Sequence, residues 1–238
     1  LMTKPPFRTP HHTASHVAIV GGGTIPKPGE ITLAHRGVLF LDEFPEFERR
    51  VVEALRQPLE DRVISISRAK GTALFPASFI LVAAMNPCPC GNFGSKRRCI
   101  CSHMALERYK RKISGPIIDR IDMWIEVANI SHEKLSEDAG ENRESERIKE
   151  NILKARSVQK ERFINTNKRV QTNSEMNSKD LSKLVKLKDD AQKSLNTAAR
   201  NMDLSPRAYH RVIKLSRTIA DLDKSTDVEE SHILEALQ

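Results

Sequence analysis

Aromatic side chains and long apolar runs are both scarce in this 238-residue sequence. Aromatic residues make up 5% and hydrophobic residues 39% of the chain, which is below the usual share for a globular protein and indicates a polar part in the second half. No apolar run approaches the ~18 residues that cross a bilayer, and no signal-peptide pattern is present. Neither a membrane nor secretion is indicated, so a cytoplasmic location is expected.

The string that holds nucleotide phosphates in many ATPases, G-x-x-x-x-G-K-[ST], is also absent. The nearest candidate is V-G-G-G-T at Val20–Thr24, but no lysine directly follows its last glycine, and Pro26 and Pro28 prevent a helix from starting there. We interpret this run as a turn. An ATP site would need its phosphate-binding loop from elsewhere.

Length and charge leave several classes of protein open. The chain is long enough for one large domain or two smaller ones with a sizeable core. A formal charge of +8 and a pI near 9.4 permit a polyanionic partner but identify none, because net charge describes non-specific association and not fold.

A pair of acids directly follows a short apolar run in G-V-L-F-L-D-E-F at residues 37–44. The run is typical of a strand covered on both faces in a parallel α/β sheet, where ligands bind at the carboxyl ends of the strands. Asp42 and Glu43 therefore match the acidic motif of nucleoside-triphosphate hydrolases, in which the first acid holds Mg²⁺ and the second orients a water. The alternative is that they begin a loop or cap a helix.

Upstream of residue 130, apolar runs alternate with helical stretches, which predicts an α/β core. We expect a helix over 46–60 that ends at Pro58, and a hairpin of V-I-S-I-S and T-A-L-F around a basic tip. F-I-L-V-A-A-M at 79–85 predicts a second buried strand, and W-I-E-V at 124–127 a last one. A basic helix is expected over about 102–113.

The second half of the chain predicts helices. Residues 131–142 are polar and acidic, as in a linker. Apolar positions at Ile148, Ile152 and Ala155, followed by Gln159, form a broken helical stripe. Residues 165–178 resemble a polar loop, and no internal repeat is evident.

All four cysteines of the chain fall in one segment, C-P-C-G-x₇-C-I-C, as Cys88, Cys90, Cys99 and Cys101. Two close pairs of thiolates suit tetrahedral Zn²⁺, and the expected compartment argues against disulfides. With four protein ligands the role of the metal would be structural. Reduced free thiols are the alternative. Four histidines, His11, His12, His16 and His103, are interpreted as loop or hydrogen-bonding residues and not as further ligands.

Five blocks in order resemble the magnesium-chelatase-like AAA+ ATPases of the ComM/YifB competence group. The blocks are P-F-R-T-P-H-H-T-A-S at Pro6–Ser15, G-E-I-T-L-A-H-R-G-V-L-F-L-D-E at Gly29–Glu43, A-M-N-P-C-P-C-G at Ala84–Gly91, S-G-P-I-I-D-R-I-D at Ser114–Asp122 and S-P-R-A-Y-H-R-V-I-K-L-S-R-T-I-A-D-L at Ser205–Leu222. Members of that family are expected to carry an N-terminal domain and the phosphate-binding loop before the first block. The resemblance therefore implies a fragment cut after that loop, inactive alone.

The resemblance implies roles for three residues of the core, with ATP and Mg²⁺ as cofactors. Asp42 resembles the acid associated with Mg²⁺, and Glu43 the acid that orients water. Asn86 resembles the polar sensor of the γ-phosphate, although an Asn before Pro87 is also a common turn former.

Two arginines complete the implied ATP site. Arg120 resembles an arginine finger that reaches the nucleotide of a neighbouring subunit, and a local ion pair with Asp119 or Asp122 is the alternative. Arg207 follows Ser205-Pro206, an N-cap and first helical position, so it lies where the helix dipole favours an anion. It resembles the second sensor of a helical lid, and a solvated surface arginine is the alternative.

Basic residues concentrate around the cysteines. In residues 96–112 seven basic side chains accompany one acid, Glu107, a local charge of +6. Together with Arg68 and Lys70 at the hairpin tip, they could follow a DNA backbone without reading sequence. A charged solvated face is the alternative.

These observations predict an AAA+ α/β core over residues 1–130, with a Cys-rich insert at 88–101, and an α-helical lid over 143–238. The resemblance implies a ring oligomer, a hexamer, that acts as an ATP-driven motor on DNA of branch-migration or helicase type. The alternatives are a chelatase-type ATPase that remodels a protein partner, and a non-catalytic zinc-stabilised DNA-binding module.

Overall fold

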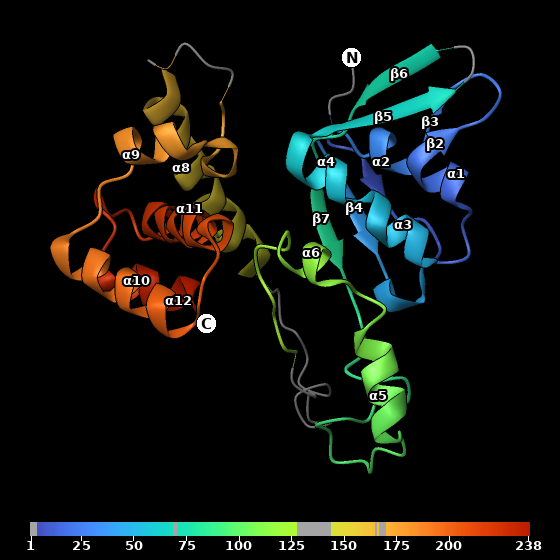
Figure 1. The fold of residues 1–238 in the computed structure, drawn as a ribbon. Helices are drawn as coiled ribbons and strands as arrows, with labels where there is room; N and C mark the ends of the chain where they lie inside the picture. Colours follow the sequence, from blue (N-terminus) through green and yellow to red (C-terminus); the bar gives the residue numbers. More distant parts are fainter. Residues whose placement is uncertain (1–3, 69–70, 128–143, 165, 167–169) are drawn as a thin grey trace. The chain divides into compact units, whose positions relative to one another are not determined.

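The structure is a computed structural model that describes residues 4–68, 71–127, 144–164, 166 and 170–238 (Figure 1). The chain divides into two compact units, residues 1–125 and residues 126–238, called here the first and the second unit. Within the described ranges, no helix combines the length and the apolar composition needed to cross a membrane.

The first unit combines strands and short helices. Its strands are β1 (Phe7–Arg8), β2 (Gly21–Gly22), β3 (Lys27–Pro28), β4 (Val38–Leu41), β5 (Val63–Arg68), β6 (Gly71–Pro76) and β7 (Ile80–Ala83). Its helices are α1 (His16–Val20), α2 (Glu30–Leu33), α3 (Arg49–Ala54), α4 (Arg56–Asp61), α5 (His103–Lys110) and α6 (Gly115–Ile118), with a 3₁₀ turn η1 (Phe44–Glu46).

A parallel sheet of order β1-β4-β7 organises the first unit. The predicted strand before the acid pair is therefore confirmed as β4, whose Leu39 and Leu41 are fully buried. Gly37 precedes this strand because the backbone of β1 passes close by: a Cβ there would lie 1.9 Å from the Pro6 carbonyl oxygen. The carboxyl ends of β4 and β7 meet at one edge of the sheet.

The second predicted strand is confirmed as β7, but the expectation that it is buried is wrong. Ile80 and Val82 are exposed, and Phe7 of β1 is exposed as well, stacked on Phe40 of β4 with 6.2 Å between ring centroids. Within the described residues β7 is an edge strand of the sheet, and Ile80 and Val82 are open to solvent. Apolar composition indicated the strand but not what packs on it.

Two other predicted elements also differ. The helix expected to end at Pro58 is two helices, α3 and α4, separated at Leu55, and α4 continues to Asp61. Pro58 is tolerated because it lies in the first turn of α4, where its missing N–H would have no helical partner. The predicted turn at V-G-G-G-T is confirmed in part: Gly23 and Thr24 begin the turn between β2 and β3, whereas Gly21–Gly22 form β2, which pairs with β3, and Val20 ends α1.

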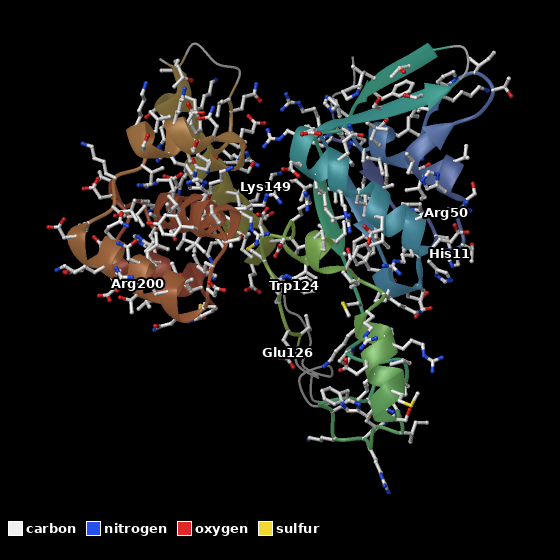
Figure 2. All side chains as sticks on the ribbon, viewed as in Figure 1. His11, Arg50, Trp124, Glu126, Lys149 and Arg200 are labelled. Atoms are coloured by element: carbon white, nitrogen blue, oxygen red, sulfur yellow. The ribbon has the colours of Figure 1, made fainter. Side chains whose placement is uncertain are left out.

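The predicted last strand at residues 124–127 is wrong. These residues form no regular secondary structure, and Trp124 and Ile125 are exposed on the segment that follows α6 (Figure 2). A strand needs a partner for its backbone groups, and within the described residues none pairs with this segment. The β propensity of the sequence alone therefore did not decide its structure.

The predicted hairpin is confirmed as the antiparallel pair β5–β6, in which Arg68 pairs with Gly71 across the tip. Ile64 and Ile66 of β5 are buried in the core of the first unit. In Figure 1 strands β5 and β6 lie at the opposite end of the first unit from α5. Lys70 lies outside the described residues, and so does the predicted linker at 131–142.

The second unit is helical, as predicted. Its elements are α8 (Glu144–Ile164), η2 (Asn173–Glu175), α9 (Ser178–Leu184), α10 (Asp189–Asn201), α11 (Pro206–Leu222) and α12 (Glu230–Ala236). The buried face of α8 consists of Ala155, Gln159 and Phe163, whereas Ile148 and Ile152 of the predicted stripe remain exposed. Of the loop predicted at 165–178, the described part contains η2 and the first residue of α9.

A buried charge network lies in this unit and was not predicted from sequence. The Asp221 carboxylate accepts hydrogen bonds from Arg162, Asn173 and Arg217, and its side chain is fully buried. Arg217, 1% exposed, also donates to the carbonyls of Ser225 and Thr226. The network therefore ties α8, η2 and the end of α11 together.

Candidate functional site

Asp42 and Glu43 leave β4 at the carboxyl edge of the parallel sheet. The ladder between β4 and β7 continues beyond both strands, because the Ala84 N–H donates to Leu41 O and the Phe44 N–H donates to Ala84 O, each at 2.9 Å. Asp42 Oδ1 accepts the Glu43 N–H at 2.8 Å. Both acids are exposed, so a cation or a water can reach them.

Glu43 has an unusual backbone conformation. Its φ of 51° and ψ of 44° place it in the left-handed region, which non-glycine residues seldom occupy and which is common at functional sites. Its side chain makes no capping hydrogen bond to η1, so the helix-cap alternative is not seen. Instead, Glu43 Oε2 lies 2.8 Å from His12 Nδ1. Sequence analysis interpreted His12 as a loop or hydrogen-bonding residue but named no partner for it, because no local pattern pairs positions 31 residues apart.

Asn86 follows β7, three residues after its end, and therefore lies near the same sheet edge as the acid pair. The Asn86 side chain is exposed. The backbone carbonyl of Asn86 accepts a hydrogen bond from the hydroxyl of buried Tyr109 at 3.1 Å. Tyr109 thereby connects α5 to the end of β7. The position of Asn86 is compatible with either a sensor or a turn residue.

Arg120 lies just after α6 and is 15% exposed. It donates to the Pro116 carbonyl at 2.6 Å and forms an ion pair with Glu60 of α4. The alternative of a local pair with Asp119 or Asp122 is therefore wrong, because the folded chain brings a more distant acid to the guanidinium. Arg120 is held by residues of its own chain in this structure.

Arg207 lies in the first turn of α11, as predicted: the Ser205 side chain accepts the Ala208 N–H at 3.2 Å, and Pro206 is the first helical residue. It borders a groove between α9 and α11. The basic and histidine side chains of α11 that line the groove are Arg207, His210, Arg211 and Lys214. Arg211 and Lys214 follow Arg207 at i+4 and i+7, the spacing of residues on one helical face. This spacing could have indicated from sequence that they lie beside Arg207.

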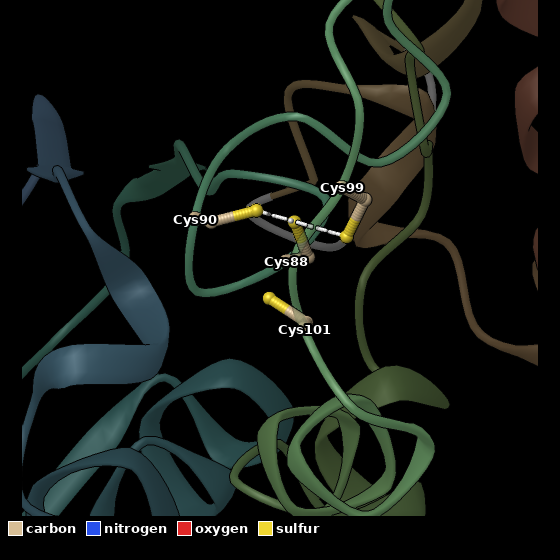
Figure 3. Close-up of side chains that lie close together, drawn as sticks. All are labelled: Cys88, Cys90, Cys99 and Cys101. Carbon is tan, nitrogen blue, oxygen red and sulfur yellow. Dashed lines mark hydrogen bonds between the residues drawn. The ribbon is translucent and has the colours of Figure 1, made fainter.

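The four cysteines come together within the first unit (Figure 3). Their sulfur atoms all lie within 4.8 Å of one another. The separations are 3.4 Å for Cys88–Cys90, 3.6 Å for Cys90–Cys99 and 3.8 Å for Cys88–Cys99. A tetrahedron with Zn–S bonds of about 2.3 Å places its sulfurs about 3.8 Å apart, whereas a disulfide needs about 2.05 Å. The donor set therefore fits a zinc ion.

Backbone groups also favour a metal at this cluster. N–H groups of Asn92 and Ile100 lower the pKa of the Cys90 thiol to about 6, and the Phe93 N–H donates to Cys88 Sγ at 3.3 Å. Burial raises the pKa of the Cys101 thiol to about 12. Four thiolates therefore do not form together by themselves, and a divalent cation would supply the charge that stabilises them.

The basic residues around the cysteines divide into two groups. Lys110 pairs with Glu107 at 3.9 Å and Lys112 with Glu46 at 2.8 Å. The loop between Cys90 and Cys99, in contrast, presents exposed Lys96, Arg97 and Arg98. Large apolar side chains are exposed on the same loop or just beyond it, namely Phe93, Ile100 and Met104. We call residues 93–104 the knuckle surface.

Comparison with known proteins covers nearly the whole chain. Residues 1–135 match the family model described as magnesium chelatase, subunit ChlI, and residues 142–238 match the model of its C-terminal part. The chain is 48% identical to competence protein ComM of Haemophilus influenzae and 42% identical to the uncharacterized protein YifB of Escherichia coli, in each case over 98% of the chain and 44% of the relative. An uncharacterized protein of Mycobacterium bovis is 38% identical over 93% of the chain and 43% of its own length.

The chain thus spans less than half the length of these relatives. The predicted resemblance is confirmed, since both family models match in order and the similar proteins include ComM and YifB. The chain belongs to the magnesium chelatase subunit ChlI family.

Proposed function

We propose that this chain supplies part of an ATP-hydrolysing site of the AAA+ type. The observation that carries the proposal is the placement of Asp42 and Glu43 directly after β4, at the sheet edge where Asn86 follows β7. Ligands of open α/β sheets bind at this edge. Membership of the magnesium chelatase family supports nucleotide chemistry there.

In this proposal each residue of the sheet edge has one task. Asp42 holds Mg²⁺ through its exposed carboxylate. The hydrogen bond from the Glu43 N–H occupies only Oδ1 and leaves Oδ2 for the metal. The metal, when bound with the nucleotide, neutralises charge on the phosphates. Glu43 orients the attacking water, and Asn86 contacts the γ-phosphate or that water.

Each of the two arginines is proposed to contact the phosphates of a nucleotide. Arg207, at the N-terminus of α11 in a groove with Arg211 and Lys214, binds phosphate oxygens together with the helix end. Arg120 acts as a finger toward the nucleotide of a neighbouring subunit in a ring, a hexamer. To do so it must exchange Glu60 for the phosphates, since Glu60 is its partner here.

The motor is proposed to act on DNA, in the cytoplasm. The knuckle surface supports this, because exposed cations beside an exposed Phe93 are the combination that binds single-stranded nucleic acid through backbone charge and base stacking. A hypothesis that joins this surface with Arg68 and Lys70 has less support. In the first unit, strands β5 and β6 lie at the opposite end from α5 (Figure 1).

The competence protein among the relatives is compatible with a DNA-remodelling role, but two alternatives remain open. A chelatase-type ATPase would remodel a protein partner, which the family name favours. A non-catalytic zinc-stabilised module would bind DNA without using nucleotide, which the cysteine cluster favours. The three differ in how ATP turnover responds to DNA.

The test measures ATP hydrolysis by the full-length protein with and without single-stranded DNA, for the unaltered protein, Glu43→Gln and Arg97→Glu. We expect DNA to raise turnover and Glu43→Gln to lower turnover by ~10²-fold or more. Arg97→Glu should weaken only the stimulation by DNA, and its difference from the unaltered protein should shrink as salt rises. Turnover that ignores DNA would favour the protein-remodelling alternative. Salt-sensitive DNA binding without any ATP turnover would favour the non-catalytic module.

A further inference from the structure

We infer that His12 is a positioning residue that holds the Glu43 carboxylate in the orientation needed for hydrolysis. The inference rests on the proposed function, because it takes Glu43 as the group that orients water. It comes from one contact, the 2.8 Å separation of His12 Nδ1 and Glu43 Oε2. Nothing in the local sequence of either residue indicates this pairing.

The contact fixes where the proton of the imidazole lies. An ionised carboxylate only accepts hydrogen bonds, so the hydrogen must be on Nδ1 of His12. The bond occupies Oε2 of Glu43 and leaves Oε1 available for a water. His12 thus keeps the Glu43 side chain in one orientation.

His12 is itself held firmly. Its ring packs against the ring of His11 with 4.2 Å between centroids and meets Phe47 edge-on at 6.4 Å. His11, labelled in Figure 2, is fixed in turn by its Nδ1 contact with Thr13 Oγ1 at 2.8 Å. Phe47 belongs to the buried core of the first unit. The His12 side chain is 27% exposed, so most of its surface packs against other protein atoms.

Glu43 needs such a support. Its side chain is 53% exposed, and no other side chain of the described residues joins its carboxylate in a hydrogen bond or an ion pair. The left-handed conformation fixes the backbone of Glu43, but an exposed glutamate side chain still has several rotamers. Pairing of β1 with β4 brings His12, four residues after β1, to the acid that follows β4.

The test uses three substitutions of one residue in the full-length protein. His12→Asn places an amide nitrogen near the position of the histidine Nδ1, and His12→Gln places one near the position of Nε2. His12→Ala has no side-chain nitrogen. We expect His12→Ala and His12→Gln to lower kcat for ATP about 10–100-fold with KM nearly unchanged, the effect of losing a hydrogen bond to a charged group. His12→Asn should recover most of kcat.

Combination with Glu43→Gln separates this inference from the proposed function. If His12 acts through Glu43, adding His12→Ala to Glu43→Gln should cost no more than about twofold further, because the two losses are not additive. Full activity of Glu43→Gln alone would contradict the proposed function. If Glu43→Gln loses activity but His12→Ala and His12→Gln both keep a normal kcat, the inference about His12 is wrong while the proposed function stands. Equal kcat values for His12→Asn and His12→Gln would also overturn the inference about His12.

Discussion

Asp221 carries a negative charge into the interior of the second unit, where two arginines surround it. Burial raises the pKa of this carboxyl, but hydrogen bonds from Arg162 and Asn173 outweigh that effect, so the net pKa lies below the ordinary value. Because the folded-state pKa is depressed, the carboxylate stabilises the unit above the pKa of an unfolded Asp, about 3.9. That stabilisation is lost as the pH falls through the lower, folded-state pKa.

The first prediction removes this charge. Asp221→Asn leaves Arg217 buried without a counter-charge, so we expect the second unit to lose ~3–5 kcal/mol of stability at neutral pH. Hydrogen exchange of the α11 amides measures this locally. Asp190→Asn is the matched control, since Asp190 is exposed and pairs with exposed Lys193 at 3.4 Å, a contact that contributes about 0–1 kcal/mol. Equal protection in the two variants would contradict the role assigned to the network.

At the scale of residues, sequence reasoning located polar groups better than it identified their partners. The acid pair, the N-cap Ser205 and the four cysteines are short-range patterns, and the structure places each as expected. The partners of Glu43 and Arg120 come from remote segments, and so do Arg162 and Asn173, two of the three partners of Asp221. A charged residue shows no local sign of whether the fold will bury it.

At the scale of elements, the Cys-rich loop depends on its sulfur cluster. Residues 88–101 contain no helix or strand, so few backbone hydrogen bonds hold the loop in place. The cluster joins both ends of the loop, and the Ser102 cap of α5 follows directly. A metal bound by all four thiolates would therefore fix both the knuckle surface and the start of α5.

The second prediction concerns this metal. Protein purified without chelators should contain about one zinc per chain, and Cys99→Ser should lower that content and the exchange protection of α5, since metal binding and local folding are coupled. Ser95→Ala, in the same loop but outside the sulfur cluster, should retain the zinc. Elemental analysis that finds no transition metal in the unaltered protein would leave the reduced thiols as the correct interpretation.

Strands show the limit of prediction at this scale. The apolar runs of β4 and β7 indicated both strands, because strand formation there agrees with pairing in a parallel sheet. Residues 124–127 have similar β propensity but remain irregular within the described residues. Propensity describes how well a residue suits a sheet, whereas a strand also needs a neighbour, and the sequence of one segment carries no information about that neighbour.

At the scale of the whole molecule, Arg120 tests the proposed assembly. In this structure it pairs with Glu60 of its own subunit, which would make it a structural residue. As a finger, it would instead stabilise charge at a neighbour's nucleotide. Breaking the same ion pair from its two sides separates these roles. In the full-length protein, Arg120→Ala should lower ATP turnover by ~10³-fold with nucleotide binding nearly intact, whereas Glu60→Gln should leave most turnover.

Mixing of subunits completes this third prediction. An Arg120→Ala subunit keeps its own Asp42 and Glu43, and a Glu43→Gln subunit keeps its arginine. In a mixed ring some interfaces therefore combine an intact acid pair with an intact arginine, and activity should return. If mixed oligomers form but remain as inactive as their parents, Arg120 does not act across the subunit boundary. Equal losses in Arg120→Ala and Glu60→Gln would assign Arg120 to the ion pair that connects α4 with the end of α6.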